Sequence, residues 1–196
     1  MASGTRLPRA ERRAQLIEAA AAAFLARGFG GTSMDDVAQE AGVSRLIVYR
    51  NFESKTLLYG AVLDSVLLEL AEQFTDVDMA TLAERGAVQM MLPVARRHPD
   101  AFRLLWRHAW HEPEFIDRSD IFRERVTYYA REMLVGAITD PIALEWAGVT
   151  AGHHLVDGIC HWLDLGDPAR DAEFALWMMA GIEALAEAWS VALRTR

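Results

Sequence analysis

Residues 32–57 read TSMDDVAQEAGVSRLIVYRNFESKTL, and this stretch decides the fold of the N-terminal part of the chain. Its apolar residues recur at the spacing of one buried helix face: Met34, Val37, Ala38 and Ala41. Thr32 is expected to cap this helix, with Asp35 three positions on to bond the free backbone donors. Gly42 ends the helix, because glycine readily adopts the left-handed conformation of a C-terminal cap. Ser44 then caps a second helix, so the stretch predicts a helix-turn-helix.

A helix-turn-helix can place its second helix in the major groove of DNA, where the first residues of that helix face the base edges. Arg45 is therefore the first candidate for base contact, since arginine can bond guanine through two hydrogen bonds. Leu46 and Ile47 offer apolar contact to thymine methyl groups. Ser44 and Thr32 supply hydroxyl groups and helix N-termini for phosphates.

The same residues resemble a known family. The matching positions are Thr32, Val37-Ala38, Ala41-Gly42-Val43-Ser44, Tyr49, Phe52, Lys55 and Leu57, and they are similar to the N-terminal signature of the TetR family of transcriptional repressors. Leu46 and Asn51 depart from that signature. The resemblance implies that Tyr49 and Lys55 touch phosphates and that the C-terminal domain binds a small molecule. The alternative for single residues is that Tyr49 and Phe52 are core and Lys55 is a solvated charge.

The predicted DNA-binding set is Thr32, Ser44, Arg45, Leu46, Ile47, Tyr49, Arg50 and Lys55. The distribution of charge agrees with this set. The chain of 196 residues has a net charge of −8, but residues 1–55 carry seven arginines and one lysine against six acidic residues. Phosphate binding depends on such a local patch rather than on the charge of the whole molecule. Part of the patch is an arm at residues 1–9, whose Arg6 and Arg9 are followed closely by Arg12 and Arg13.

The whole chain predicts an all-α protein. We expect a three-helix DNA-binding domain at 1–55, then a larger helical domain at 56–196 that binds ligand and dimerises. Helices at 141–165 and 171–193 are expected to form a four-helix bundle with their copies, since a dimer can reach both halves of a palindromic operator on double-stranded DNA. The small residues expected at that interface are Ala147, Gly148, Ala151 and Gly152.

Composition favours a cytoplasmic protein. Cys160 is the sole cysteine, so no internal disulfide can form. The longest stretch without charged residues, Trp146–Val156, has 11 residues and is too short to span a bilayer. No phosphate-binding loop or nucleophile elbow is present, so neither an enzyme nor a cofactor is expected. The rival function is a helical small-molecule carrier or enzyme of the same fold without DNA binding.

Tryptophan and histidine are frequent between residues 98 and 162, which favours a pocket for a largely apolar or aromatic effector, and a cation is also compatible. The expected lining is Phe102, Trp106, Trp110, Met133, Trp146 and His153, although each could equally be plain core. A metal site is the second interpretation of this region. Its ligand sets would be His154, Asp157 and His161, or His153, Asp157 and Cys160. Histidines on a packed helix more often bond the backbone, so no metal is predicted.

Overall fold

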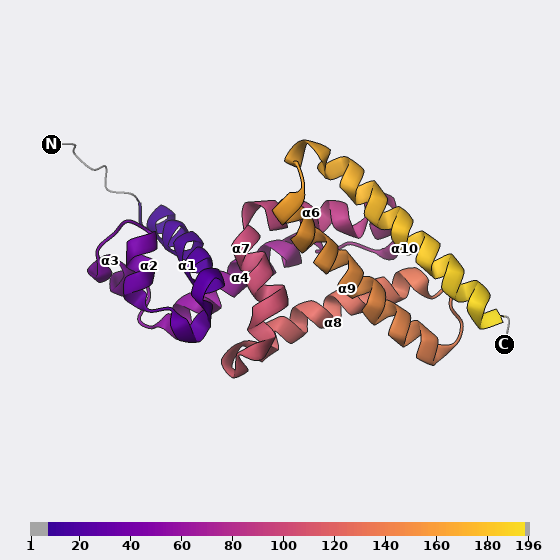
Figure 1. Cartoon of the computed structure of the whole chain (residues 1–196), viewed down its shortest axis with the longest axis horizontal. Coiled ribbons are helices and arrows are strands. Elements are labelled where there is room, and N and C mark those ends of the chain that lie inside the picture. Colours follow the sequence, from indigo (N-terminus) through magenta and orange to yellow (C-terminus); the bar gives the residue numbers. More distant parts are fainter. Residues whose placement is uncertain (1–7, 195–196) are drawn as a thin grey trace.

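The computed structural model describes residues 8–194 and contains helices but no strand within that range (Figure 1). The N-terminal helices are α1 (Arg9–Gly31), α2 (Met34–Glu40) and α3 (Arg45–Asn51). They are followed by α4 (Lys55–Gln73), α5 (Met79–Arg85), α6 (Ala87–Arg97), α7 (Pro99–Arg103), α8 (Ile116–Leu134), α9 (Pro141–Leu165) and α10 (Asp171–Arg194). A π-helical turn at Leu104–His108 and short 3-10 turns connect α7 to α8. The predicted all-α fold is confirmed.

The start of α2 differs by one residue from the prediction. Ser33, not Thr32, is the N-cap: its hydroxyl accepts from the Asp36 amide, and the Asp36 carboxylate accepts from the Ser33 amide at 2.8 Å. These two bonds form a capping box, which satisfies two of the free donors at the helix start. Thr32 is instead buried, and its hydroxyl donates to the carbonyl of Gly28 at 2.7 Å.

The first helix is kinked at Gly28, before its last turn. Gly28 has a φ of +73°, a backbone conformation that glycine adopts at little cost, and one further turn follows it up to Gly31. This turn carries Phe29 into an aromatic cluster with Tyr59 of α4 and Phe115 before α8. The ring centroids of Tyr59 and Phe115 are 4.6 Å apart. The cluster therefore ties the N-terminal helices to the middle of the chain.

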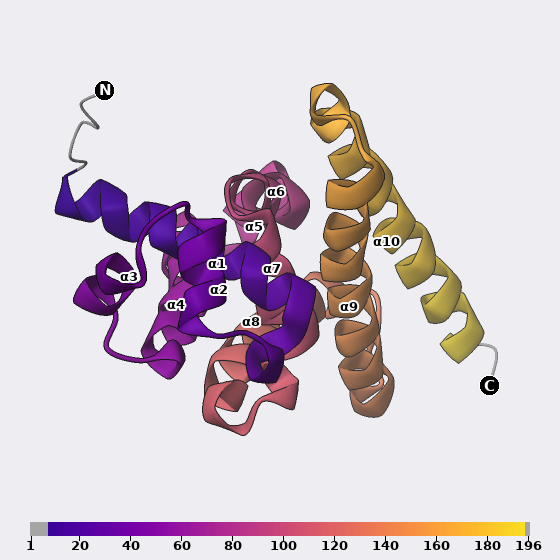
Figure 2. The ribbon, with the colours of Figure 1, turned by 60° about the vertical axis from the view of Figure 1, so that its left-hand side comes forward.

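The two long C-terminal helices lie on the side away from α1–α3 (Figures 1 and 2). Glycines allow α9 to lie very close to α8. A Cβ added at Gly148 would lie 2.9 Å from Cβ of Arg131, and one at Gly152 would lie 2.9 Å from Cγ1 of Val126. The prediction that Ala147, Gly148, Ala151 and Gly152 meet a second copy is therefore wrong: all four are buried against the protein's own α8 side.

Large apolar side chains remain uncovered on α9 and α10. Ile142, Trp146, Leu176 and Trp177 are each more than half exposed. By length and composition alone, Pro168–Leu193 is apolar enough to cross a membrane, with a mean hydropathy of 1.3 and 22% of that window buried. The exposed face of these helices thus requires a covering partner or a functional reason.

Candidate nucleic-acid interface and effector cavity

The turn between α2 and α3 fixes the direction of α3. Gly42 has a φ of +63°, and the amide of Val43 donates to the carbonyl of Ala38 at 3.0 Å. Within α3 itself, Val48 is the buried residue. Helix α3 has seven residues and is anchored by the buried Val48 and by the turn, so most of its surface is exposed.

Five of the eight predicted DNA-binding residues share this exposed surface: Ser44, Arg45, Leu46, Tyr49 and Arg50. The Arg45 guanidinium donates to the Asp35 carboxylate at 2.9 Å and to the Tyr49 hydroxyl at 3.3 Å. The bond to Tyr49 and the charge of Asp35 raise the pKa of Arg45, so it stays charged at any working pH. Because this ion pair is exposed, exchanging Asp35 for another acceptor costs little.

The other three predicted residues have structural roles. Ile47 is half-buried and packs against the core of the three-helix unit. The Thr32 hydroxyl is buried and bonded internally, so its proposed use for phosphate is incorrect. Lys55 donates from Nζ to the Phe29 carbonyl at 2.7 Å, and Nζ lies 4.5 Å from the centre of the Phe29 ring.

Arg13 has a contact that sequence reasoning missed. Its guanidinium donates to the Asn51 carbonyl at 3.2 Å and lies over the Phe52 ring at 4.1 Å. It therefore supports the C-terminal end of α3, which carries the negative end of the helix dipole. Arg9 and Arg12 lie at the start of α1, while Arg6 and most of the predicted arm fall outside the described residues.

A cavity of about 260 Å³ lies among α4, α6, α8 and α9. Its walls are almost entirely aliphatic and aromatic. They consist of Leu67, Leu68, Leu70, Ala71, Phe74, Ala87, Met91, Ile121, Phe122, Arg125, Val126, Tyr129, Ala130, Met133 and Leu155. Of the six predicted effector-binding residues, Met133 alone is among them.

The other five do not form a common lining. Phe102 and Trp106 are buried in the core, and Trp106 donates from Nε1 to the Asp157 carboxylate at 2.7 Å. His153 and Trp110 lie at the surface beside Arg123. Trp146 is exposed and contacts Trp189, with ring centroids 4.9 Å apart. The prediction of one indole-lined pocket is therefore wrong, since no tryptophan is among the described residues that line the cavity.

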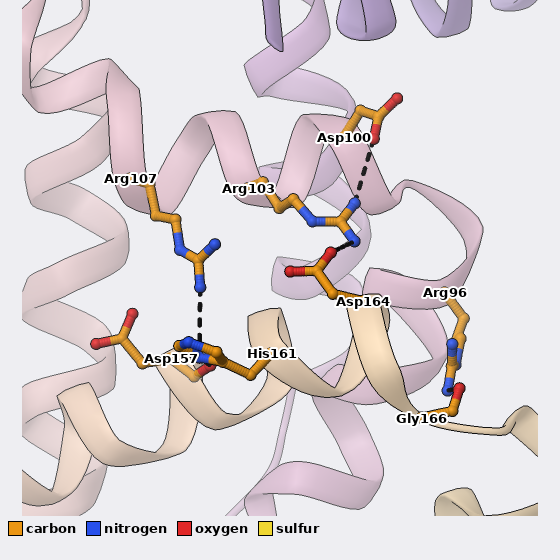
Figure 3. Close-up of polar contacts among 8 residues, drawn as sticks. All are labelled: Arg96, Asp100, Arg103, Arg107, Asp157, His161, Asp164 and Gly166. Carbon is orange, nitrogen blue, oxygen red and sulfur yellow. Dashed lines mark hydrogen bonds and ion pairs between the residues drawn. The ribbon is translucent and has the colours of Figure 1, made fainter. Parts of the chain in front are cut away.

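Two of the three histidines considered as metal ligands, His153 and His161, bond backbone carbonyls of their own helix. His161 donates from Nδ1 to the Asp157 carbonyl at 2.8 Å, and Arg107 points toward the same ring (Figure 3). The Asp157 carboxylate accepts from Trp106. Within residues 8–194, no three His, Cys, Asp or Glu side chains come close enough to hold a metal ion.

Cys160 lies in the C-terminal part of α9 and is fully buried. Burial raises the pKa of its thiol to about 11, so the thiol stays protonated near neutral pH. A protonated, buried thiol does not suit a nucleophile.

Known proteins match this chain in sequence and in structure. Residues 16–62 match the family model for bacterial regulatory proteins of the tetR family. The HTH-type transcriptional activator FasR of Mycolicibacterium smegmatis is 32% identical over 63% of this chain. That match spans 59% of FasR, less than two thirds of its length. An HTH-type transcriptional repressor of Streptomyces coelicolor is 30% identical over 66% of this chain and 69% of its own.

A solved structure agrees with the fold. A TetR-like transcriptional regulator from a Rhodococcus species has a TM-score of 0.70 at 22% identity, covering 94% of this chain and 96% of that one. At 22% sequence identity, this structural similarity establishes the fold and not the function. The family match, the similar repressor and the shared fold agree, and the chain therefore belongs to the tetR family of bacterial transcription regulators.

Proposed function

We propose that this regulator is a repressor that binds a palindromic DNA operator as a dimer and releases it when a small apolar molecule occupies the cavity. The observation that carries the DNA-binding part is the exposed surface of α3, where two arginines, a serine, a leucine and a tyrosine lie together. The similar Streptomyces protein is a repressor whereas the similar FasR is an activator, so the direction of regulation is itself part of the proposal. In this proposal, residues 1–55 bind DNA, and residues 56–196 bind the ligand and form the dimer. Such a protein works in the cytoplasm, where the DNA is.

DNA binding is tested with a duplex selected by the protein itself from a random pool. Arg45→Ala should cost roughly 1–3 kcal/mol on the selected site and relax discrimination at one position, because a base contact is lost. Arg50→Ala should weaken all sequences about equally and reduce the salt slope by about one. Arg85→Ala removes an exposed arginine from α5 and is the matched control.

The rival function, a carrier without DNA binding, gives a different result in the same experiment. It predicts no enriched sequence and an affinity for duplex that hardly varies with salt. That outcome would exclude the operator and leave the cavity as a transport or storage site.

Dimerisation is supported by the exposed apolar side chains of α9 and α10, whose area a second copy would cover. Trp177→Glu places a charge on this surface without disturbing the buried side of α10, so it should shift sedimentation from dimer to monomer. Glu183→Gln on the same helix is a control that keeps the surface apolar. A wild-type monomer at micromolar concentration contradicts the dimer.

The effector part rests on the position of the cavity. Helix α4 lines it with Leu67, Leu70 and Phe74 and begins at Lys55, which is bonded to the end of α1. Arg118 of α8 bonds Asp64 in the middle of α4 at 2.7 Å. A ligand that separates α4 from α8 therefore acts on the helix that carries α1–α3. It lowers operator affinity only by the difference in its own affinity for the two arrangements.

A further inference from the structure

The rim of the cavity carries polar side chains, whereas its walls are apolar. Ile121, Arg125 and Tyr129 follow one another at every fourth position of α8, so they lie along one edge of that helix. Arg125 is the one charged residue among the described residues that line the cavity. It also lines an adjoining surface groove, together with Thr75, Glu124 and Tyr128. Cavity and groove share Arg125 and Tyr129, so an occupant can extend from one into the other.

Arg125 differs from the other arginines of α8. Arg118 bonds Asp64, Arg123 bonds the Trp106 carbonyl, and Arg131 lies within 4 Å of Glu132 and Glu145. For Arg125, by contrast, no ion pair is found within residues 8–194. Next to it on the rim, the Tyr129 hydroxyl is a second donor with no hydrogen-bond partner in the same range. Two donors at the mouth of an apolar cavity match a ligand group that only accepts hydrogen bonds.

The cavity limits the apolar part of the ligand. A water molecule takes about 30 Å³ of liquid volume, so about 260 Å³ has room for roughly nine groups of that size. The walls offer aliphatic carbon and aromatic faces, which favour a hydrocarbon body with no buried polar group.

We propose that the effector of this regulator is an amphiphilic carboxylate, whose apolar body of about nine heavy atoms fills the cavity and whose carboxylate bonds Arg125 and Tyr129 at the rim. This rests on the proposed function, since it names the ligand of the same cavity. It also replaces the indole-lined pocket for aromatic or cationic molecules that the sequence favoured. A cation would meet Arg125 at the only polar end of the cavity, and like charges repel.

Calorimetric titration of the full-length protein with three ten-carbon probes tests the head group. Decanoate, 1-decanol and decylammonium share one tail, so their order reports the charge preference. We expect decanoate to bind tightest and decylammonium weakest. Arg125→Gln should weaken decanoate roughly three- to tenfold, as expected for a charged hydrogen bond at a partly exposed site. It should leave decanol within about twofold, since the alcohol needs no positive charge.

The neighbouring Glu124→Gln is the matched control. It changes charge by the same amount in the same groove with the opposite sign, so decanoate should bind equally well or better. Ala71→Trp fills the passage between cavity and groove and should weaken all three probes, while its circular dichroism melt checks that it folds.

The outcomes separate the two proposals. Decylammonium or decanol binding as tightly as decanoate, or decanoate binding unchanged in Arg125→Gln, overturns the carboxylate. Decanoate binding that is unaffected by Ala71→Trp overturns the location. If none of the three probes binds, the cavity is no effector site, and the ligand-controlled part of the proposed function fails with it.

Discussion

The close approach of α9 to α8 at Gly148 gives the sharpest stability prediction. In Gly148→Ala, the new Cβ would lie 2.9 Å from Cβ of Arg131, 3.2 Å from its Cα and 3.3 Å from its backbone nitrogen. Two of these three atoms belong to the backbone of α8, which no change of rotamer can move. The methyl group can therefore be accommodated only if α9 moves away from α8, and that movement loosens the packing of Val126 and its neighbours.

Two opposing contributions set the magnitude. Overpacking a well-packed core costs typically about 1–3 kcal/mol, and a contact with backbone belongs at the upper end. Alanine regains about 1 kcal/mol over glycine in a helix interior. The net loss in the free energy of unfolding should be roughly 1–2 kcal/mol. For a chain of this size that lowers the melting temperature by about 2–8 °C.

Gly158→Ala on the same helix is the control. Its new Cβ would meet Cε and Sδ of Met178, the flexible end of a side chain that can turn aside. This variant should therefore equal the wild type or exceed it by up to about 1 kcal/mol. Urea unfolding measures the stability of both variants. The protein concentration is kept fixed, because the apparent stability of a dimer depends on concentration. The reasoning fails if Gly148→Ala is as stable as the wild type, or if both variants lose the same amount.

Two further predictions concern polar contacts. Lys55→Met should lower the free energy of unfolding by about 1 kcal/mol, because the Nζ bond to the Phe29 carbonyl is lost. Arg50→Ala, an exposed change on α3, should stay within about 0.5 kcal/mol in the same urea titration. The second prediction concerns Asp171. A hydrogen bond from Arg96, and a further one from Trp162, hold the pKa of Asp171 below its usual range. The stability from this lowered pKa is present above the unfolded pKa of about 3.9 and is lost as the pH falls through the folded value. Asp171→Asn should therefore be less stable than the wild type at pH 7, and the difference should shrink at pH 3; a constant difference would contradict the assignment.

The helix-turn-helix could be predicted because its signals are local. Caps, the turn glycine and the buried stripe lie within a few residues of one another. The structure differs at the two caps: Ser44 stands at the N-cap of α3 without a side-chain cap bond, and Ser33 replaces Thr32 at α2. Both residue types are good caps, and both have an aspartate three positions on, so local chemistry could not decide between them. The preceding helix decides: the Thr32 hydroxyl donates to the Gly28 carbonyl, four positions earlier, and does not cap α2.

The cavity could not be predicted in the same way, because it depends on which faces of distant helices meet. Sequence reasoning ranked residues by aromatic content and chose indoles, but Trp106 is held in the core by Asp157 and Trp146 lies at the surface. A different pattern in the sequence indicates the cavity. The segment 58–74 carries apolar residues on more than one face, and a helix with a single neighbour does not need so many. Part of that surface packs against α1, and another part lines the cavity beside α8. The helix that a sequence reader would treat as a connector is therefore the element that both the DNA-binding unit and the cavity share, and it is the route that we propose for the action of an effector on α3.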